Sequence, residues 1–244
     1  MEKVLCTFGD SKYKNSLKLL NDSATSIGKV DRVIQYTKEE LQPSDFWRKN
    51  SFILNRPRGA GYWIWKPYII LETFKQVNDG DVVMYSDAAV EVISDLTPLF
   101  DLAESGINNG KVVFQLAGGH NNKTWTKRDT FVLMGLDEEK YWSALQTTAS
   151  YHLWVKSSEN IDYLTQYQRY LRDPRIVTDD PNMAGRPNHL EFKDHRHDQS
   201  VLSLMTIRDN FKRFRDPSQF GVSEINLFPD SNYPQLFNHH RRKA

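Results

Sequence analysis

Apolar and polar stretches alternate along the chain in a way that predicts strands and helices in turn. Lys3–Thr7 is a short apolar run that ends in a turn, and Tyr13–Ile27 carries apolar residues at helical spacing until Gly28. Val30–Tyr36 has the pattern of a second strand. A strand, a helix and a strand in this order predict a right-handed crossover and a parallel sheet.

The strongest strand signal lies in Val82–Ser86, where four consecutive apolar residues precede Ser86. Such a run indicates a strand that is buried on both faces. The turn Asn78–Asp81 leads into it, and Tyr68–Val77 before that turn is predicted to be a helix with Pro67 near its first turn.

The rest of the chain continues the alternation and has one long polar loop, Asp180–Asp194. Further helices are predicted over Ser44–Leu54, Leu96–Ser105, Glu159–Leu171 and Asp198–Thr206, and further strands over Val90–Ile93, Lys111–Leu116 and Thr148–Val155. We therefore expect an α/β layered fold. No Gly/Ser/Pro-rich or charged linker divides the 244 residues, so one domain is expected.

The charge balance argues against nucleic acid as a partner. Lys and Arg total 32 and Asp and Glu total 31, so the chain has no overall basic field. The one local excess is the C-terminal stretch His239–Lys243. It is either a solvated, frayed terminus or a site of peripheral attachment to anionic lipid.

Cysteine and hydropathy indicate the compartment. The single cysteine, Cys6, rules out an intrachain disulfide and has the setting of a small core residue. No apolar run approaches the roughly 18 residues that a transmembrane helix needs, and the N-terminus has no signal-peptide pattern. We expect a cytoplasmic protein without a transmembrane segment.

Asp87 is the first candidate for chemistry because it directly follows the buried strand Val82–Ser86. In open α/β sheets, ligands bind outside the carboxyl ends of the parallel strands. In an extended chain, Asp87, Ala89 and Glu91 share one side. A carboxylate there can reach a pyrophosphate through a divalent cation, or it can bind ribose hydroxyls. An Asp that caps the turn is the alternative.

Several ordered motifs carry a resemblance to a known family. Gly61–Pro67 (GYWIWKP), a predicted helix and Asp79–Ala88 (DGDVVMYSDA) resemble the donor-site half of bacterial and viral capsular or surface-polysaccharide glycosyltransferases of the GT-A fold. The pattern continues in Lys127–Gly135, in Asp173–Ile176 with Thr178–Asn182, and in His195–Leu202.

The resemblance implies a single GT-A domain, Rossmann-like, with a mainly parallel central sheet flanked by helices. Residues 1–116 would form the nucleotide-sugar donor half, residues 117–230 the acceptor and catalytic half, and residues 231–244 a basic tail.

The segment after the strand departs from the wider GT-A pattern. That group usually has Asp-x-Asp as ligands of manganese or magnesium, whereas the second position here is Ala89. Glu91 could join Asp87 in holding Mn²⁺ or Mg²⁺. Alternatively, Lys66, Arg56 and Arg58 could neutralise the phosphates without an ion.

Asp198-Gln199 is similar to the Asp-Gln-Asp segment of the glycogenin-like and lipopolysaccharide galactosyltransferase group, with Ser200 in the third place. The resemblance implies that Asp198 and Gln199 lie under the anomeric carbon of the donor and that the reaction retains configuration. Oxygen atoms there would stabilise an oxocarbenium-like centre. A helix N-cap is the alternative role for Asp198.

The remaining candidates form a donor-binding set. Its members are Thr7, Phe8, Gly9, Arg56, Arg58, Trp65, Lys66, Ser86, Asp87, Ala88, Arg128, Asp129, His195 and His197. Some of them have structural alternatives. The histidines could bind a metal or the diphosphate or be packed structurally, Trp63 and Trp65 could stack on ligand or simply pack, and Arg128-Asp129 could be a surface ion pair.

The sequence thus predicts an enzyme that transfers a hexose from a nucleotide sugar, a uridine diphosphate sugar by preference, to a glycan or another hydroxyl acceptor. One alternative is a non-catalytic nucleotide- or carbohydrate-binding protein. Another is a metal-dependent phosphohydrolase or nucleotidyltransferase built on His195, His197, Asp194 and Asp198.

Overall fold

A mixed six-stranded sheet forms the centre of the computed structural model, which describes residues 1–240. Its strands are β1 (Lys3–Phe8), β2 (Arg32–Tyr36), β3 (Val82–Ser86), β5 (Lys111–Phe114), β6 (Tyr151–Val155) and β7 (Arg213–Phe214). They lie in the order β2-β1-β3-β6-β5-β7. β1 is parallel to β2 and β3, and β5 to β7, while β6 is antiparallel to both of its neighbours. The predicted α/β class with a mainly parallel sheet is confirmed.

The chain opens with the predicted βαβ unit. Helix α1 (Lys14–Ser26) connects β1 to β2, and the register pairs Cys6 with Ile34. Gly28 follows the helix at a close approach, since a Cβ there would lie 2.7 Å from the carbonyl oxygen of Ala24. Glycine therefore suits the exit from α1.

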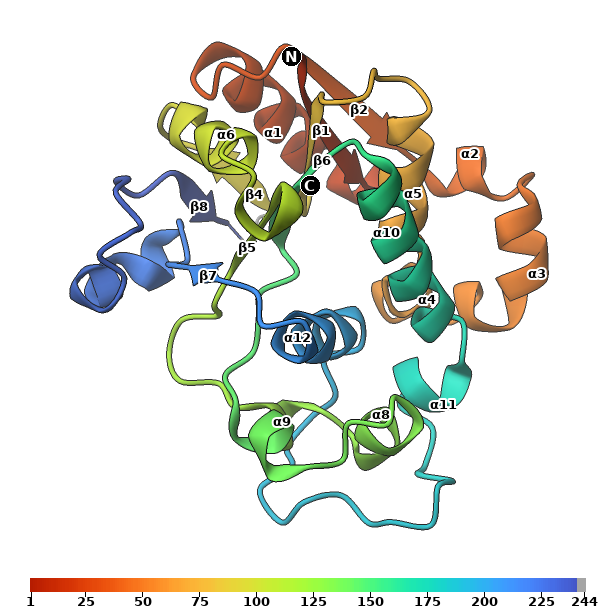
Figure 1. Cartoon of the computed structure of the whole chain (residues 1–244). Coiled ribbons are helices and arrows are strands. Elements are labelled where there is room, and N and C mark those ends of the chain that lie inside the picture. Colours follow the sequence, from red (N-terminus) through yellow and green to blue (C-terminus); the bar gives the residue numbers. More distant parts are fainter. Residues whose placement is uncertain (241–244) are drawn as a thin grey trace.

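The two faces of the sheet bury two separate cores. Val82 and Met84 of β3 face α1 and α6 (Thr97–Glu104), whereas Val83 and Tyr85 face α5 (Trp65–Phe74) and α10 (Ser158–Leu171). Figure 1 shows these helices on opposite sides of the sheet. This alternation follows from the two-residue period of a strand.

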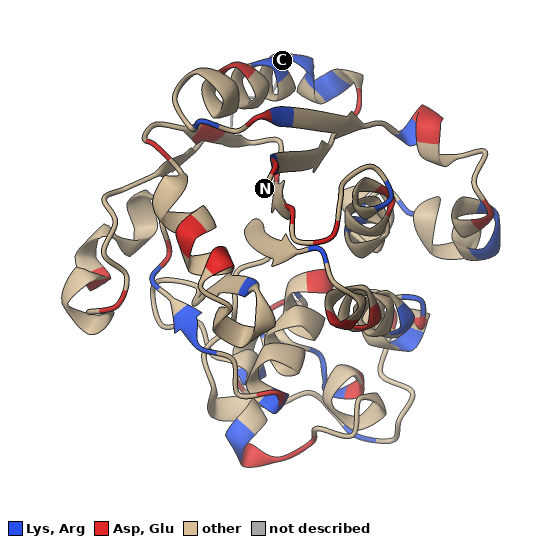
Figure 2. Cartoon of the chain, turned by 45° about the horizontal axis from the view of Figure 1, so that its top comes forward, with Lys and Arg blue, Asp and Glu red and all other residues tan. Residues whose placement is uncertain are grey.

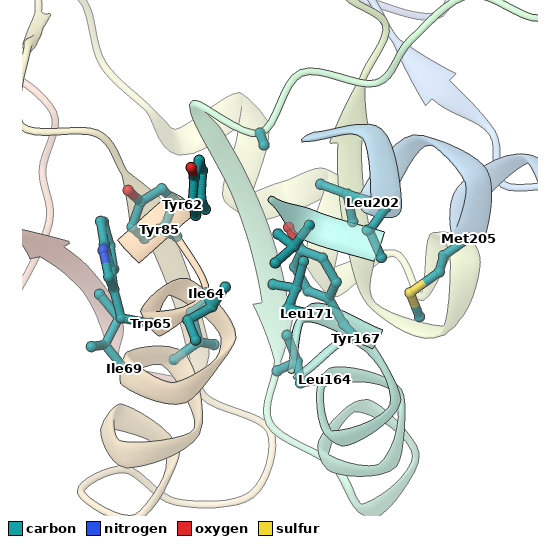
Figure 3. Packing of buried hydrophobic residues seen from close by; sticks show 14 of the residues in the cluster. Tyr62, Ile64, Trp65, Ile69, Tyr85, Leu164, Tyr167, Leu171, Leu202 and Met205 are labelled. Carbon is teal, nitrogen blue, oxygen red and sulfur yellow. The ribbon is translucent and has the colours of Figure 1, made fainter. Parts of the chain in front are cut away.

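Helix α12 (Asp198–Arg208) extends the second core. It packs against α10, and Figure 3 shows apolar side chains of α5, α10 and α12 gathered in this region. Leu202 and Met205 of α12 are fully buried. The packing fixes the first residue of α12 near the ends of β3 and α5.

Shorter elements fill the connections. The helices are α2 (Lys38–Leu41), α3 (Asp45–Leu54), α4 (Gly59–Tyr62), α7 (Asn122–Trp125), α8 (Arg128–Leu133), α9 (Glu139–Ser143) and α11 (Pro174–Val177), and the 3-10 segments are η1 (Ser11–Tyr13), η2 (Ile107–Asn109) and η3 (Gln219–Leu227). Strands β4 (Val90–Val92) and β8 (Phe237–His239) form a separate antiparallel pair. Ser44 caps α3 as predicted, by accepting a hydrogen bond from the backbone N–H of Trp47.

Several predicted boundaries differ from the structure by one to three residues, and the starts of α5 and β6 show why. Helix α5 begins at Trp65 rather than Tyr68, because Pro67 fits within the first turn, where its missing N–H is not needed. Strand β6 begins at Tyr151 rather than Thr148, because the N–H of Ala149 donates to the side chain of Gln199 instead of to a neighbouring strand.

The C-terminal region is more ordered than predicted. Leu236 and Phe237 are fully buried, and β8 pairs with β4 up to His239. The frayed terminus that was the first interpretation of His239–Lys243 is therefore wrong at His239. Arg241, Arg242 and Lys243 of the predicted basic tail lie outside the described residues.

Cys6 is confirmed as a core residue, since it is fully buried and burial raises the pKa of its thiol to about 12. Among residues 1–240, no helix has the length and apolar character needed to cross a membrane. Basic and acidic residues are interspersed over the ribbon, as Figure 2 shows.

Candidate active site

A cavity of about 430 Å³ opens at the carboxyl ends of β1 and β3. Phe8 and Gly9 from the end of β1 line it, together with Asp87–Ala89 from the end of β3 and with Trp63 and Trp65. The position is the one expected for a ligand in an open α/β sheet. The volume lies in the range of small-molecule sites. We call it the larger cavity.

A second cavity of about 210 Å³, the smaller cavity, adjoins the first. Lys66, Asp198, Gln199 and His197 contribute to its walls. Trp63 and Asp87 line both cavities, so the two spaces meet beside these residues. The structure thus brings together the strand-end carboxylate and the Asp198-Gln199 pair, which come from distant parts of the sequence.

Lys66 connects the two carboxylates. Its side chain is 2% exposed, and its Nζ lies 2.6 Å from Oδ2 of Asp198 and 3.5 Å from Oδ1 of Asp87. Nζ also donates to the carbonyl oxygen of Ala149 at 2.8 Å. An ammonium group has three hydrogens, so these contacts occupy it. Lys66 orients the carboxylates rather than presenting a free charge to the cavity.

The charges of this cluster shift its protonation equilibria. Burial raises the pKa of Asp198 to about 6, against the opposing effect of Lys66, while the nearby charge of Asp87 raises it further. Burial alone would lower the pKa of Lys66, but Asp198 and Asp87 outweigh it, and the pKa lies above its ordinary value. Lys66 therefore stays charged at neutral pH, and Asp198 exchanges its proton near the physiological range.

The structure contradicts the N-cap role for Asp198. His197 occupies the N-cap position of α12, and Asp198 is the first helical residue. Its carboxylate pairs with Lys66 at 2.6 Å. A hydrogen bond with the backbone N–H of Gln199 also favours the ionised form of Asp198.

The side chains of Gln199 and Asp87 are also held by neighbours. Nε2 of Gln199 donates to Oε1 of Gln146 at 2.8 Å, and its Oε1 accepts the N–H of Ala149 at 3.3 Å. Oδ1 of Asp87 accepts the hydroxyl of Tyr85 at 2.5 Å. Asp87 thus binds a strand residue and Lys66, which differs from the turn-capping alternative.

The segment that carries Trp63 has an unusual backbone. All residues of Gly59–Trp63 have positive φ, from 50° at Ala60 to 95° at Gly61. This left-handed turn costs roughly 1–2 kcal/mol for each residue with a side chain. Such strain persists where the surroundings enforce it, often at functional sites. A Cβ at Gly61 would lie 2.5 Å from the Cα of Leu54, so this position requires glycine.

Trp63 was not in the predicted donor-binding set, although it lines both cavities. Its ring stacks on that of His197 with a centroid separation of 5.6 Å. Trp65 stacks on Phe8 at 4.1 Å, and its indole N–H donates to the carbonyl oxygen of Gly59. The signal that could have identified Trp63 is the Gly-Ala-Gly run just before it, since glycines permit a left-handed turn.

The two predicted arginines pair with carboxylates of the long loop. Arg58 lines the smaller cavity, and its guanidinium lies 3.1 Å from Asp179 and 2.7 Å from Asp194. Arg56 lies 3.4 Å from Asp180. These pairs are partly exposed, so the arginines remain near the surface around the cavity.

His195 and His197 lie 4.9 Å apart, centroid to centroid, in different settings. Nε2 of His195 donates to the carbonyl oxygen of Ile176, and its Nδ1 accepts the N–H of Lys127, so both ring nitrogens are used. Burial lowers the pKa of His195 well below its ordinary value. His195 lies behind the cavities rather than in their walls.

His197 lines the smaller cavity and has a strained backbone, with a φ of 49°. Its Nδ1 donates to the carbonyl oxygen of Val177 at 2.7 Å. Burial lowers the pKa of His197 to about 4, so the ring is neutral at pH 7. Its Nε2 is the acceptor nitrogen and lies 3.7 Å from Oδ1 of Asp179.

Arg128 and Asp129 lie away from both cavities, at the start of α8. The carboxylate of Asp129 accepts the N–H groups of Met183 at 2.6 Å and of Ala184 at 3.0 Å. Arg128 pairs with Asp137 at 2.9 Å, not with Asp129. The predicted alternative of an Arg128-Asp129 ion pair is therefore wrong.

Thr7, Ser86 and Ala88 complete the predicted set. Thr7 and Ser86 are fully buried, and the hydroxyl of Ser86 donates to the carbonyl oxygen of Asp87 at 3.2 Å. Ala88 lines the larger cavity beside Asp87. Thr7 and Ser86 line neither cavity, so the structure does not bring these two predicted residues into the site.

The donor atoms near Asp87 do not form a protein cage for a metal ion. In the part of the chain that the structure describes, no three His, Cys, Asp or Glu side chains are placed to hold an ion. Glu91 lies in β4 opposite Asn238, outside the walls of both cavities. Binding of Mn²⁺ or Mg²⁺ stays a prediction.

The sheet topology and a crevice at the ends of its parallel strands define an α/β fold of the glycosyltransferase type. Solved structures with this fold include mouse xyloside xylosyltransferase 1 in its apo form (10% identity, TM-score 0.51, 98% of this chain and 97% of that chain). A glycosyltransferase involved in glycosylation of the major capsid of PBCV-1 is similar at 11% identity and TM-score 0.50, over 99% and 96% of the two chains. The bifunctional glycosyltransferase WbbM, in its apo structure, aligns at 11% identity and TM-score 0.56, over 99% of this chain and 46% of that chain.

These similarities confirm the predicted glycosyltransferase fold. At 10–11% identity they establish the fold alone. No protein-family model and no curated protein sequence matches the chain.

Proposed function

We propose that the chain transfers a hexose from a uridine diphosphate sugar to a hydroxyl of a glycan or another acceptor, with retention of configuration. The observation that carries the proposal is the buried Lys66 between Asp87 and Asp198, where the two cavities meet. The similarity to solved glycosyltransferases supports the reaction class. We further place the protein in the cytoplasm and in surface-glycan or polysaccharide synthesis.

In this proposal the larger cavity takes the nucleoside. Phe8, Trp63 and Trp65 supply aromatic surface on which a base can stack. Asp87, at the border, would bind ribose hydroxyls or, through an ion, the diphosphate. Arg58 and Arg196 in the walls of the smaller cavity would stabilise the departing diphosphate.

The smaller cavity takes the sugar, with Asp198 and Gln199 beside its anomeric carbon. During transfer, the bond from this carbon to the diphosphate oxygen breaks and the acceptor oxygen bonds to the same carbon. The proton of the acceptor hydroxyl passes to the departing diphosphate. The carboxylate of Asp198 and the amide oxygen of Gln199 would stabilise the positive charge that develops on the ring.

The test is release of nucleoside diphosphate from a panel of sugar nucleotides and acceptor glycans, with Mn²⁺, with Mg²⁺ and with chelator. We expect release with one donor class and its loss in Asp198→Asn and Gln199→Ala. Asp22→Asn, on the exposed face of α1, is the matched control and keeps activity. Unchanged release in Asp198→Asn contradicts the proposed role of the cluster.

The same assay separates the alternatives. Binding of a nucleotide sugar without release by folded protein would support a non-catalytic binding protein. Cleavage of the pyrophosphate bond, with dependence on His197, would support a phosphohydrolase or nucleotidyltransferase. Either result overturns the transferase proposal.

A further inference from the structure

Tyr85 contacts the carboxylate that borders both cavities, although it is not in the predicted donor-binding set. It lies in β3 and is fully buried, yet its side chain reaches the wall of the larger cavity. Its hydroxyl donates to Oδ1 of Asp87 at 2.5 Å, and the Nζ of Lys66 lies 4.7 Å from the centroid of its ring. One side chain thus contacts two of the three charged residues of the site.

The geometry of the strand explains why Tyr85 can reach Asp87. Successive side chains of a strand point to opposite faces, so residues two positions apart share a face. Side chains of a strand also lean along its direction. Asp87 directly follows β3, and the long side chain of Tyr85 therefore brings its hydroxyl to the carboxylate two residues ahead.

The ring of Tyr85 is fixed by other rings. His152 is its partner across β3 and β6, and the two rings stack with a centroid separation of 5.3 Å. Nδ1 of His152 accepts the indole N–H of Trp154 at 2.6 Å, which holds the imidazole in turn. The tilted ring of Trp65 lies 6.3 Å from that of Tyr85, and Figure 3 shows these two side chains side by side. The hydroxyl of Tyr85 therefore has a fixed position.

This hydroxyl gives the two oxygens of Asp87 different surroundings. Oδ1 accepts the hydroxyl of Tyr85 and lies 3.5 Å from the Nζ of Lys66. Oδ2 has no hydrogen-bond partner among residues 1–240, and the side chain of Asp87 is 32% exposed. A phenol keeps its proton at neutral pH, so Tyr85 is a donor to the carboxylate. Without this donor, no other hydrogen bond of the Asp87 side chain would keep both of its oxygens from turning toward Lys66.

We propose that Tyr85 is a positioning residue, whose hydroxyl holds Asp87 so that Oδ2 accepts a ribose hydroxyl of the donor. The inference rests on the proposed function, in which the larger cavity takes the nucleoside. It commits Asp87 to direct contact with the ribose. Hydrogen bonds to a charged acceptor are stronger than those between neutral groups. Loss of the correctly oriented carboxylate should therefore be visible in nucleotide affinity.

The test compares the affinity of uridine diphosphate with that of its 2′-deoxy and 3′-deoxy analogues by titration calorimetry, with Mn²⁺ and with chelator. For the wild type, we expect the dissociation constant of one analogue to be about tenfold higher or more, because that analogue lacks the hydrogen bond to the carboxylate. In Tyr85→Phe, which keeps the ring, this ratio should fall to about threefold or less. Both affinities are measured on the same variant, so a smaller folded fraction cancels from the ratio.

Tyr36→Phe is the matched control. Tyr36 is a buried residue of the same sheet, its hydroxyl bonds to that of Thr73 at 3.1 Å, and it lines neither cavity. The ratio in this variant should equal that of the wild type. An Asp87→Ala background tests whether Tyr85 acts through Asp87. Adding Tyr85→Phe to Asp87→Ala should change the affinity for uridine diphosphate by less than about twofold.

The outcomes distinguish this inference from the proposed function. The positioning role is wrong if the ratio is the same in the wild type and in Tyr85→Phe, or if the wild type binds both deoxy analogues as tightly as uridine diphosphate. Either result leaves the transferase proposal standing. A folded wild type that does not bind uridine diphosphate overturns the inference together with the proposed uridine donor.

Discussion

Two groups of buried or half-buried polar residues differ in what their side chains contact. The cavity cluster, Lys66, Asp87 and Asp198, consists of charges that contact one another beside open space. The loop cluster, Lys127, Asp129 and His195, binds mainly main-chain groups of residues 176–184. Both come from segments in which the sequence predicted functional residues.

The comparison separates a structural role from a chemical one. Each carboxylate oxygen of Asp129 accepts a backbone N–H, and the ammonium of Lys127 donates to the carbonyl oxygens of Thr178 and Asp180. Such pairing satisfies buried groups and fixes the long loop. In the cavity cluster, two carboxylates share one lysine, and the pKa of Asp198 rises to about 6 as burial disfavours its charge. Perturbed groups beside a cavity are candidates for catalysis.

The largest expected effect is on turnover in Asp198→Asn. We expect kcat to fall by about 100- to 10,000-fold, because the amide lacks the charge that stabilises the transition state. Stability should be kept or raised, because burial disfavours the charge of Asp198, as its raised pKa indicates, and Lys66 keeps Asp87 as a charged partner. Nucleoside diphosphate release and urea denaturation measure the two quantities. Activity within threefold of the wild type would remove Asp198 from the mechanism.

The loop cluster should respond in the opposite way. In Asp129→Asn, an NH₂ group replaces one of the two carboxylate oxygens that each accept a backbone N–H. Because an NH₂ group is a donor, one of the two hydrogen bonds is lost, and the free energy of unfolding should drop by about 2–3 kcal/mol. Turnover per folded molecule should be nearly unchanged, because Asp129 lines neither cavity. A large loss of kcat at unchanged stability would place Asp129 with the cavity cluster instead.

The pH dependence of the cavity cluster should have opposite signs for activity and stability. Transfer needs ionised Asp198, so kcat/KM should fall as pH decreases through about 6. The folded-state pKa of Asp198 lies above the ordinary value of 3.8 for an aspartate. The folded state thus binds this proton more tightly, and the contribution of Asp198 to stability rises as pH falls from about 7 to about 4. The difference in the free energy of unfolding between wild type and Asp198→Asn, measured as a function of pH, isolates the contribution of Asp198. An activity that does not change between pH 5 and 8 would contradict the assignment.

The smallest expected effect concerns the left-handed turn that carries Trp63. Ala60→Gly should stabilise the fold by about 0.5–1 kcal/mol, because relief of a positive φ outweighs the greater freedom of glycine in the unfolded chain. Ala184 is not among the residues with positive φ, so Ala184→Gly should be destabilising. Thermal denaturation compares the two. An equal decrease in melting temperature in Ala60→Gly and Ala184→Gly would show that the turn is unstrained.

The fold could be predicted for those elements that are long enough to show a regular spacing of apolar residues. The period of apolar residues identified β1, α1, β2 and β3, and the strand end then pointed to Asp87. The pairing of β8 with β4 could not be predicted, because β8 is three residues long and its partner is distant in the sequence. Short strands leave too few positions for a period to show.

The candidate site could be predicted in part. The sequence marked Lys66, Asp87 and Asp198 separately, but the geometry of a lysine between two carboxylates depends on how α5, β3 and α12 pack. It could not show that Asp129 and His195 bind main-chain groups, because nothing in residue type distinguishes a backbone partner from a ligand. Trp63 was missed from the binding set because the turn that places it has a conformation that few sequences adopt.

The central claim is that the cavity cluster forms the donor site, and a crystal structure of Asp198→Asn tests it most directly. The crystals would be soaked with the nucleotide sugar that most raises the melting temperature, since a ligand of the folded state stabilises it. The account predicts the nucleoside in the larger cavity, against Phe8 and Trp63, with the anomeric carbon in contact with Gln199 in the smaller one. Electron density for the nucleotide sugar at the loop cluster, or anywhere outside the two cavities, would contradict the claim.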